Sequence, residues 1–102
     1  MKDPLKMLRQ VQQMQDKMKK VQQELENETV DATAGGGAVK VVATGAQKVV
    51  SVTIDPAATE DQEMLQDLIV AAVNEAMEKS KALAASRMQS VAAGLGLPPG
   101  LI

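Results

Sequence analysis

The first pattern along the chain is a regular spacing of apolar residues near its N-terminus. Between Pro4 and Asn27 these residues recur at intervals of four, three, four, three and four. Such heptad spacing predicts a helix with one apolar seam, roughly 30 Å long at about 1.5 Å per residue. Pro4 fits the first helical turn, and Asp3 fits the capping position before it. The seam residues are Met7, Val11, Met14, Met18, Val21 and Leu25.

The next segment, from about residue 28 to 55, is rich in β-branched residues and predicts three short strands. Gly35–Gly37 would form the first turn and Gly45–Gln47 the second. The third strand, VVSVTIDP, ends where Asp55 and Pro56 interrupt the hydrogen-bond ladder. Its alternate residues predict one apolar face, consisting of Val50, Val52 and Ile54.

A second apolar stripe predicts a long helix from about residue 60 to 94. Thr59 and Gln62 have the form of a capping box at its start. Gly94 and Gly96 predict its end, and Leu97-Pro98-Pro99-Gly100 predicts an extended tail within residues 95–102. The prediction is therefore one α+β domain over residues 1–102: a long N-terminal helix, a three-stranded antiparallel sheet and a long C-terminal helix.

The composition indicates that this domain shares its stability with a second copy. The chain has 102 residues and contains no Phe, Tyr or Trp. A monomer of this size buries a modest share of its surface, and aromatic residues usually supply much of the buried area. We therefore expect a homodimer. The absence of Cys fits a reducing cytoplasm, and no segment has the apolar length of a membrane span or signal peptide.

Catalysis is a poor expectation for this sequence. Because His and Cys are both absent, the usual hydrolytic triads and most zinc sites are excluded. We expect no metal, no cofactor and no enzymatic activity. Glu60, Asp61 and Glu63 are the nearest approach to a catalytic carboxylate cluster, but negative charge at a helix start is the simpler interpretation. A carboxylate hydrolase would require these residues to lie in a concave pocket.

Charge is distributed unevenly along the chain. The net charge is -2, yet residues 1–23 hold six basic and two acidic residues, a net charge of +4. Residues 60–78 hold six acidic residues and no basic one, a net charge of -6. Several basic residues of the N-terminal helix share its outward face, and Lys79, Lys81 and Arg87 form a second, smaller basic cluster on the far half of the second predicted helix. Dimerisation would present two such basic faces on one particle.

These features favour a protein that contacts the backbone of duplex DNA. Without aromatic residues the chain cannot stack exposed bases, as binders of single strands do. Phosphate contacts carry little sequence information, so we expect weak specificity. The candidate DNA-binding residues are Lys6, Arg9, Gln13, Lys17, Lys19, Lys20, Lys81 and Arg87. Two alternatives remain: the basic face only keeps a coiled coil soluble, or the acidic protein is an adaptor for a DNA replication or recombination factor.

Five segments in order resemble the YbaB/EbfC family: MLRQVQQMQDKMKKVQQEL, AGGGAVKV, VSVTIDP, MLQDLIVAAVNEA and AGLGLPPG. The resemblance covers roughly residues 5 to 100. It implies a small cytoplasmic, nucleoid-associated bacterial protein that binds DNA as a homodimer, with long helices projecting from a joined β core. Gly96 stands where members often carry Pro, and the chain ends in Leu101-Ile102 without the common aromatic.

Overall fold

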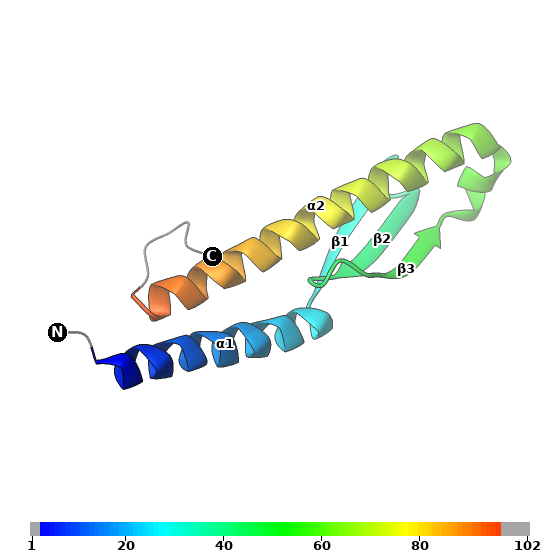
Figure 1. The fold of residues 1–102 in the computed structure, drawn as a ribbon. Helices are drawn as coiled ribbons and strands as arrows, with labels where there is room; N and C mark the ends of the chain where they lie inside the picture. Colours follow the sequence, from blue (N-terminus) through cyan, green and yellow to red (C-terminus); the bar gives the residue numbers. More distant parts are fainter. Residues whose placement is uncertain (1–2, 97–102) are drawn as a thin grey trace.

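The structure is a computed structural model that describes residues 3–96 (Figure 1). The molecule measures 70 × 21 × 16 Å, and its radius of gyration is 19.2 Å. A compact domain of this length would have a radius of about 13 Å. The elongation arises because two long helices extend beyond a small sheet. We call the sheet with residues 56–80 the base, and we call the first helix with residues 81–94 the arm.

The first helix, α1, spans Pro4–Asn27 and confirms the element predicted from the heptad spacing. Asp3 caps it, since its carboxylate accepts a hydrogen bond from the Leu5 N–H at 3.0 Å. At the other end the Glu28 N–H donates to the Glu24 carbonyl at 3.0 Å before the chain turns into the sheet. A local sequence signal therefore sets the start of this helix.

The sheet has the order β1-β2-β3, and both strand pairs are antiparallel. Its strands are β1 Thr29–Ala34, β2 Val39–Thr44 and β3 Val49–Ile54, which confirms the three predicted strands. The second turn requires a glycine, because a Cβ on Gly45 would lie 2.7 Å from the Leu25 Cδ2 atom and 3.1 Å from the Leu25 carbonyl oxygen. This close approach joins the second turn to the end of α1.

The core lies between the sheet and the first half of the second helix, α2, which spans Gln62–Gly94. This helix packs on β1 and β2, and small side chains allow the close contact (Figure 1). Since Ala and Val fill the interface, no aromatic residue is needed there. The buried apolar residues of this core are Ala32, Val39, Val41, Ala43, Ala72 and Ala76.

The apolar face predicted for β3 is only partly used within the protomer. Ile54 packs against the core, but Val50 is 59% exposed and Val52 is 43% exposed. Val52 pairs with Val41 in the register, so both side chains lie on the face of the sheet that α2 covers. Because α2 packs on β1 and β2, it leaves the same face of β3 open.

The seam of α1 is buried at one end and open at the other. Leu25 is buried, and Met14, Met18 and Val21 are half-buried. Met7 and Val11, which the heptad spacing also assigned to the seam, are about half exposed, at 51% and 48%. These two residues line a groove together with Gly94, the last residue of α2. The first turns of α1 thus lie beside the end of α2.

The predicted capping box at the start of α2 is wrong. Thr59 belongs to a separate 3₁₀ helix, η1 (Pro56–Glu60), and its hydroxyl donates to the Pro56 carbonyl at 2.6 Å. Asp61 caps α2 instead, because its carboxylate accepts from the Met64 N–H at 3.1 Å. The error has a local cause: Asp55 and Pro56 begin a short helix of their own, which places the start of α2 at Gln62.

The α2 helix ends at Gly94, as the glycines predicted, and Gly96 has a left-handed φ of 72°. The extended tail predicted at Leu97–Gly100 lies outside the described residues. Within residues 3–96, neither helix carries a stretch that is long and apolar enough to span a lipid bilayer.

Candidate nucleic-acid interface

Five of the predicted DNA-binding residues form a line along one flank of α1. They are separated by three or four residues, which places them on neighbouring turns of the same face, and all are exposed. From first to last the line spans about 21 Å at about 1.5 Å per residue. We call this line the basic row; it consists of Lys6, Arg9, Gln13, Lys17 and Lys20.

Two charged residues modify this picture. Lys19 is exposed but lies two residues from Lys17, about 200° around the helix, so the structure does not place it on the basic row. Asp16 lies four residues before Lys20 and therefore on the same side as the row. Four cations thus accompany Asp16 along the row, and a second carboxylate, Glu24, lies on the same flank four residues beyond Lys20.

Part of the basic row faces a groove between the two helices of the arm. Lys17 and Lys20 line it from α1, and Arg87 lines it from α2. The groove has a volume of about 330 Å³ and is open to solvent. The fold therefore brings Arg87 close to two residues that lie about seventy positions away in the sequence.

Arg87 is not a free cation. Its guanidinium forms an ion pair with Glu28 and a second one with Glu24, whose Oε2 lies 3.7 Å from Nη1. The Glu28 Oε2 atom is buried and has no hydrogen-bond partner among the described residues. Because Arg87 joins α2 to the end of α1, its first role is to hold the arm together. Carboxylates already compensate its positive charge.

The remaining basic residues of α2 lie apart from the basic row. Lys81 is exposed and is not among the residues that line the groove. Lys79 is occupied within the base: its ammonium donates to the Asp31 carbonyl at 2.9 Å and lies 3.6 Å from a Glu75 carboxylate oxygen. The small basic cluster that the sequence indicated on α2 is therefore dispersed.

Sequence reasoning missed two residues that border the basic row. Ser90 and Gly94 line the groove beside Arg87. Their spacing from Arg87, three and seven residues, places all three on one face of α2. That periodicity was a usable signal, but only once the identity of the facing helix was known.

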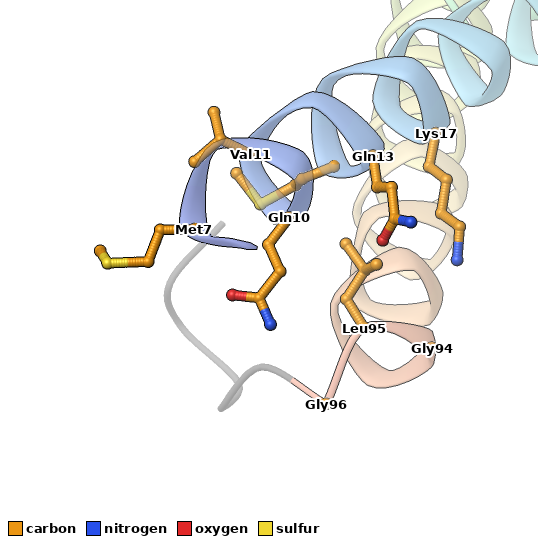
Figure 2. Close-up of a pocket in the computed structure, with 9 residues that line it drawn as sticks. Met7, Gln10, Val11, Gln13, Lys17, Gly94, Leu95 and Gly96 are labelled. Carbon is orange, nitrogen blue, oxygen red and sulfur yellow. The ribbon is translucent and has the colours of Figure 1, made fainter. Parts of the chain in front are cut away.

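Toward the open end of the arm the helices enclose a second groove, which we call the tip groove (Figure 2). Gln10, Gln13 and Lys17 extend from α1 toward the end of α2, and Leu95 points back toward α1. Met7, Val11 and Met14 supply apolar lining, and Gly94 and Gly96 complete the wall. Gln13 and Lys17 therefore belong both to the basic row and to this groove.

The acidic residues near the start of α2 do not form a catalytic pocket. Glu60, Asp61 and Glu63 are all exposed, and the Asp61 carboxylate is used to cap the helix. Within residues 3–96 there is no group of three or more potential metal ligands. The capped, solvent-facing helix end excludes the carboxylate hydrolase considered from the sequence.

The same fold is present in the crystal structure of an uncharacterized protein of Helicobacter pylori, with a TM-score of 0.76. The match covers 93% of this chain and 98% of the other at 19% sequence identity, so it supports the fold alone. A chain with the same arrangement of helices and sheet has thus been observed in a crystal.

Sequence comparisons show much closer relatives. A nucleoid-associated protein of Pelotomaculum thermopropionicum is 52% identical over 95 residues, covering 91% of this chain and 90% of the relative. One from Ruminiclostridium cellulolyticum is 47% identical over 97 residues, covering 93% and 84%. One from Dictyoglomus turgidum is 45% identical over 103 residues and covers 99% of both chains.

Residues 1–95 match the family described as the YbaB/EbfC DNA-binding family. The match spans nearly the whole chain and agrees with the order of elements and with the expectation that the protein is not an enzyme. On these grounds the chain belongs to the YbaB/EbfC DNA-binding family, whose relatives in the comparison are nucleoid-associated proteins.

Proposed function

We propose that the protein binds duplex DNA as a homodimer with low sequence specificity, using the basic row of each α1 to contact phosphates. The observation that carries this proposal is the exposed line of Lys6, Arg9, Lys17 and Lys20 on one flank of the arm. Phosphate contacts from Lys and Arg supply most of the affinity in non-specific DNA binding. The basic row would thus contact the DNA phosphates, and the base would form the homodimer.

The distribution of charge explains how a protein with a net charge of -2 can bind a polyanion. The acidic residues Glu60, Glu63 and Asp67 lie in the base, at the opposite end of α2 from the arm (Figure 1). Charges separated by more than about 10 Å are largely screened at moderate salt. DNA lying along α1 would therefore meet the positive flank and remain distant from this acidic end.

The proposed dimer is supported by the open face of β3. Edge strands with exposed backbone groups and apolar side chains readily pair with another chain. β3 lies at one edge of the sheet and exposes Val50 and Val52, and the register places Val52 on the side that α2 leaves bare. A second copy pairing along β3 would extend the sheet and cover these side chains.

The flank of α2 beside β3 adds to this apolar surface. Lys79 reaches the Asp31 carbonyl in β1, so its side of α2 faces β1. Val70 lies nine residues earlier, half a turn around the helix, and therefore on the side of β3. It is 59% exposed. We call Val50, Val52 and Val70 the β3 patch and propose that it is the centre of the dimer interface.

Salt-dependent DNA binding tests the role of the basic row. If Arg9, Lys17 and Lys20 of two subunits neutralise about six phosphates, the logarithm of the affinity should fall against the logarithm of salt concentration with a slope of about -5. Replacing all three residues by Gln should flatten the slope strongly while the circular dichroism of the protein is unchanged. The measurement is a titration of labelled duplex at several salt concentrations.

Lys40→Gln combined with Lys48→Gln is the matched control, because these lysines are exposed and lie outside α1. This variant should keep the slope of the unmodified protein. A folded triple variant with an unchanged slope would remove the basic row from the proposal.

Disrupting the β3 patch tests the dimer separately. Val50→Lys with Val52→Lys would place four like charges in a two-subunit interface, so we expect monomers by light scattering, or a melting temperature that no longer rises with protein concentration. Leu8→Lys is the control, since Leu8 is a 53% exposed residue of the arm. A Val50/Val52 variant that remains as dimeric as the Leu8 variant would place the interface elsewhere.

A further inference from the structure

Glu24 is a carboxylate that lies among the cations of the arm. It follows Lys20 by four residues and Lys17 by seven, so the three side chains lie on one flank of α1. All three line the groove that Arg87 lines from α2, which we call the inner groove. A negative charge at this position opposes the approach of a phosphate group. Glu24 therefore lowers the affinity for phosphate that its cationic neighbours can provide.

Arg87 is paired with two carboxylates at the end of α1, and the two pairs are unequal. Its Nη2 group donates a hydrogen bond to the Glu28 carboxylate. Its Nη1 atom lies 3.7 Å from the Glu24 Oε2 atom, a separation longer than a hydrogen bond. The Glu24 side chain is also 43% exposed, so water competes for this second pair. The Glu24 pair is therefore the weaker of the two and the easier to exchange for another anion.

Glu28 is held by its backbone at the junction between α1 and the sheet. Its N–H donates to the Glu24 carbonyl at 3.0 Å, and its carbonyl accepts from the Gly45 N–H at 2.9 Å. These bonds fix the point from which its side chain reaches Arg87. A guanidinium has five N–H donors, so the bond to Glu28 leaves donors for a phosphate oxygen. Loss of the Glu24 pair would therefore leave Arg87 in place beside the inner groove.

We propose that the inner groove is a phosphate subsite formed by both helices and that Glu24 weakens it by pairing with Arg87. Lys17 and Lys20 form the side of the subsite on α1, and Arg87 forms the side on α2. The ligand is a backbone phosphate of duplex DNA, so the subsite rests on the proposed function. Exchanging Glu24 for a phosphate on Arg87 gains little, because the displaced carboxylate remains beside the phosphate. Glu24 thus withholds Arg87 from DNA in the unmodified protein.

Removal of the Glu24 charge tests the subsite. Glu24→Gln keeps the length of the side chain and should release Arg87 to one further phosphate in each subunit. The slope of the logarithm of affinity against the logarithm of salt concentration should steepen from about -5 to about -7, since each contact contributes about -0.9. Adding Arg87→Gln should return the slope to about -5, whereas adding Arg87→Lys should keep most of the gain. Titration of labelled duplex at several salt concentrations measures each protein.

Glu26→Gln is the matched control. Glu26 is exposed on the same helix and lies two residues from Glu24, about 200° around the axis. It is not among the described residues that line the inner groove. Because both variants lose one carboxylate, they have the same net charge. The slope of the Glu26 variant should nevertheless stay near that of the unmodified protein.

The arginine side chains provide a second measurement on the same proteins. The chain has two arginines, Arg9 and Arg87. When duplex is added, the side-chain Nε NMR signal of Arg9 should move in the unmodified protein and in the Glu24→Gln protein. The signal of Arg87 should move strongly only in the Glu24→Gln protein. Arg9 therefore reports on the basic row, and Arg87 reports on the subsite.

Failure of the subsite and failure of the proposed function give different results. Equal slopes for the Glu24 and Glu26 variants, with an unmoved Arg87 signal, would overturn the subsite while the Arg9 response still supports the basic row. A steeper slope that persists after Arg87→Gln is added would also overturn it, because Glu24 would then act without Arg87. A flat slope for the unmodified protein, together with an unmoved Arg9 signal, would contradict the proposed function and the subsite with it.

Discussion

The base and the arm of this molecule are built from similar residues but hold them in different ways. In the base, Val41 is fully buried between the sheet and α2. In the arm, Val11 occupies a seam position of equal regularity and is 48% exposed. The base surrounds its apolar residues with two layers, whereas the arm is a pair of helices that meet along one line. Stability is therefore concentrated in the base, which leaves the arm open for contacts with other molecules.

The same difference appears in how the two regions treat polar groups. In the base, the buried Ser80 hydroxyl donates to the Thr44 carbonyl at 2.7 Å and accepts from the Gln47 N–H at 3.1 Å. These bonds fasten the second turn of the sheet to α2. In the arm, the principal polar contact is the part-exposed cluster of Arg87 with Glu24 and Glu28. Water and salt have access to the arm contact and are excluded from the base contact.

The largest effect should come from one methyl-deleting substitution made in both regions. Val41→Ala should lower the free energy of unfolding by about 2 kcal/mol or more, since it removes buried methyl groups and leaves a cavity. Val11→Ala should change it by less than about 0.5 kcal/mol, because Val11 is half exposed and Ala favours helix. Urea denaturation at one fixed protein concentration measures both. Equal losses would show that the arm is packed as tightly as the base.

An intermediate effect is expected from Ser80→Ala. The change leaves the Thr44 carbonyl and the Gln47 N–H without their partner, which should cost about 1–3 kcal/mol. Ser90→Ala is the control, because the exposed Ser90 hydroxyl only donates to the Ser86 carbonyl within α2. Thermal unfolding of both variants would show the difference. A Ser80 variant as stable as the Ser90 variant would show that the two hydrogen bonds of the Ser80 hydroxyl do not stabilise the base.

The smallest effect on global stability should come from Arg87→Gln. Its ion pairs are part-exposed, so the loss should be about 1 kcal/mol or less. Because Arg87 connects α2 to the end of α1, backbone amide exchange should nevertheless accelerate in α1 and stay slow in β2. Exchange mass spectrometry resolves the two regions. Uniform acceleration would mean that Arg87 stabilises the base as well.

The Arg87 variant also distinguishes two roles of Arg87: joining the two helices of the arm and contacting DNA. Its salt dependence of DNA binding should change less than that of Lys17→Gln, because carboxylates already neutralise Arg87. A larger change in the slope for Arg87→Gln would make it a phosphate contact in spite of its ion pairs.

The sequence predicted the elements of this fold because their signals are local. The spacing of seam residues and the Asp3-Pro4 start defined α1, and the glycine turns separated the strands. Local signals failed where two of them competed. Thr59 and Gln62 formed a plausible cap, but Asp55 and Pro56 began a separate short helix, and Asp61 took the capping role. A cap depends on which of several nearby side chains reaches a free N–H, and spacing alone does not decide that.

The part of the candidate site on α1 was predictable from the sequence, whereas the part formed by contacts between α1 and α2 was not. Helical periodicity places Lys6, Arg9, Lys17 and Lys20 on one flank in any straight helix, so the sequence by itself determined the basic row. The tertiary structure alone decided the pairing of Arg87 with Glu24 and Glu28, residues about sixty positions away. It also decided that β3 stays uncovered and that the seam opens at Met7. Burial and ion pairing depend on which distant segment arrives opposite a residue, and the periodicity within one segment carries no information about that partner.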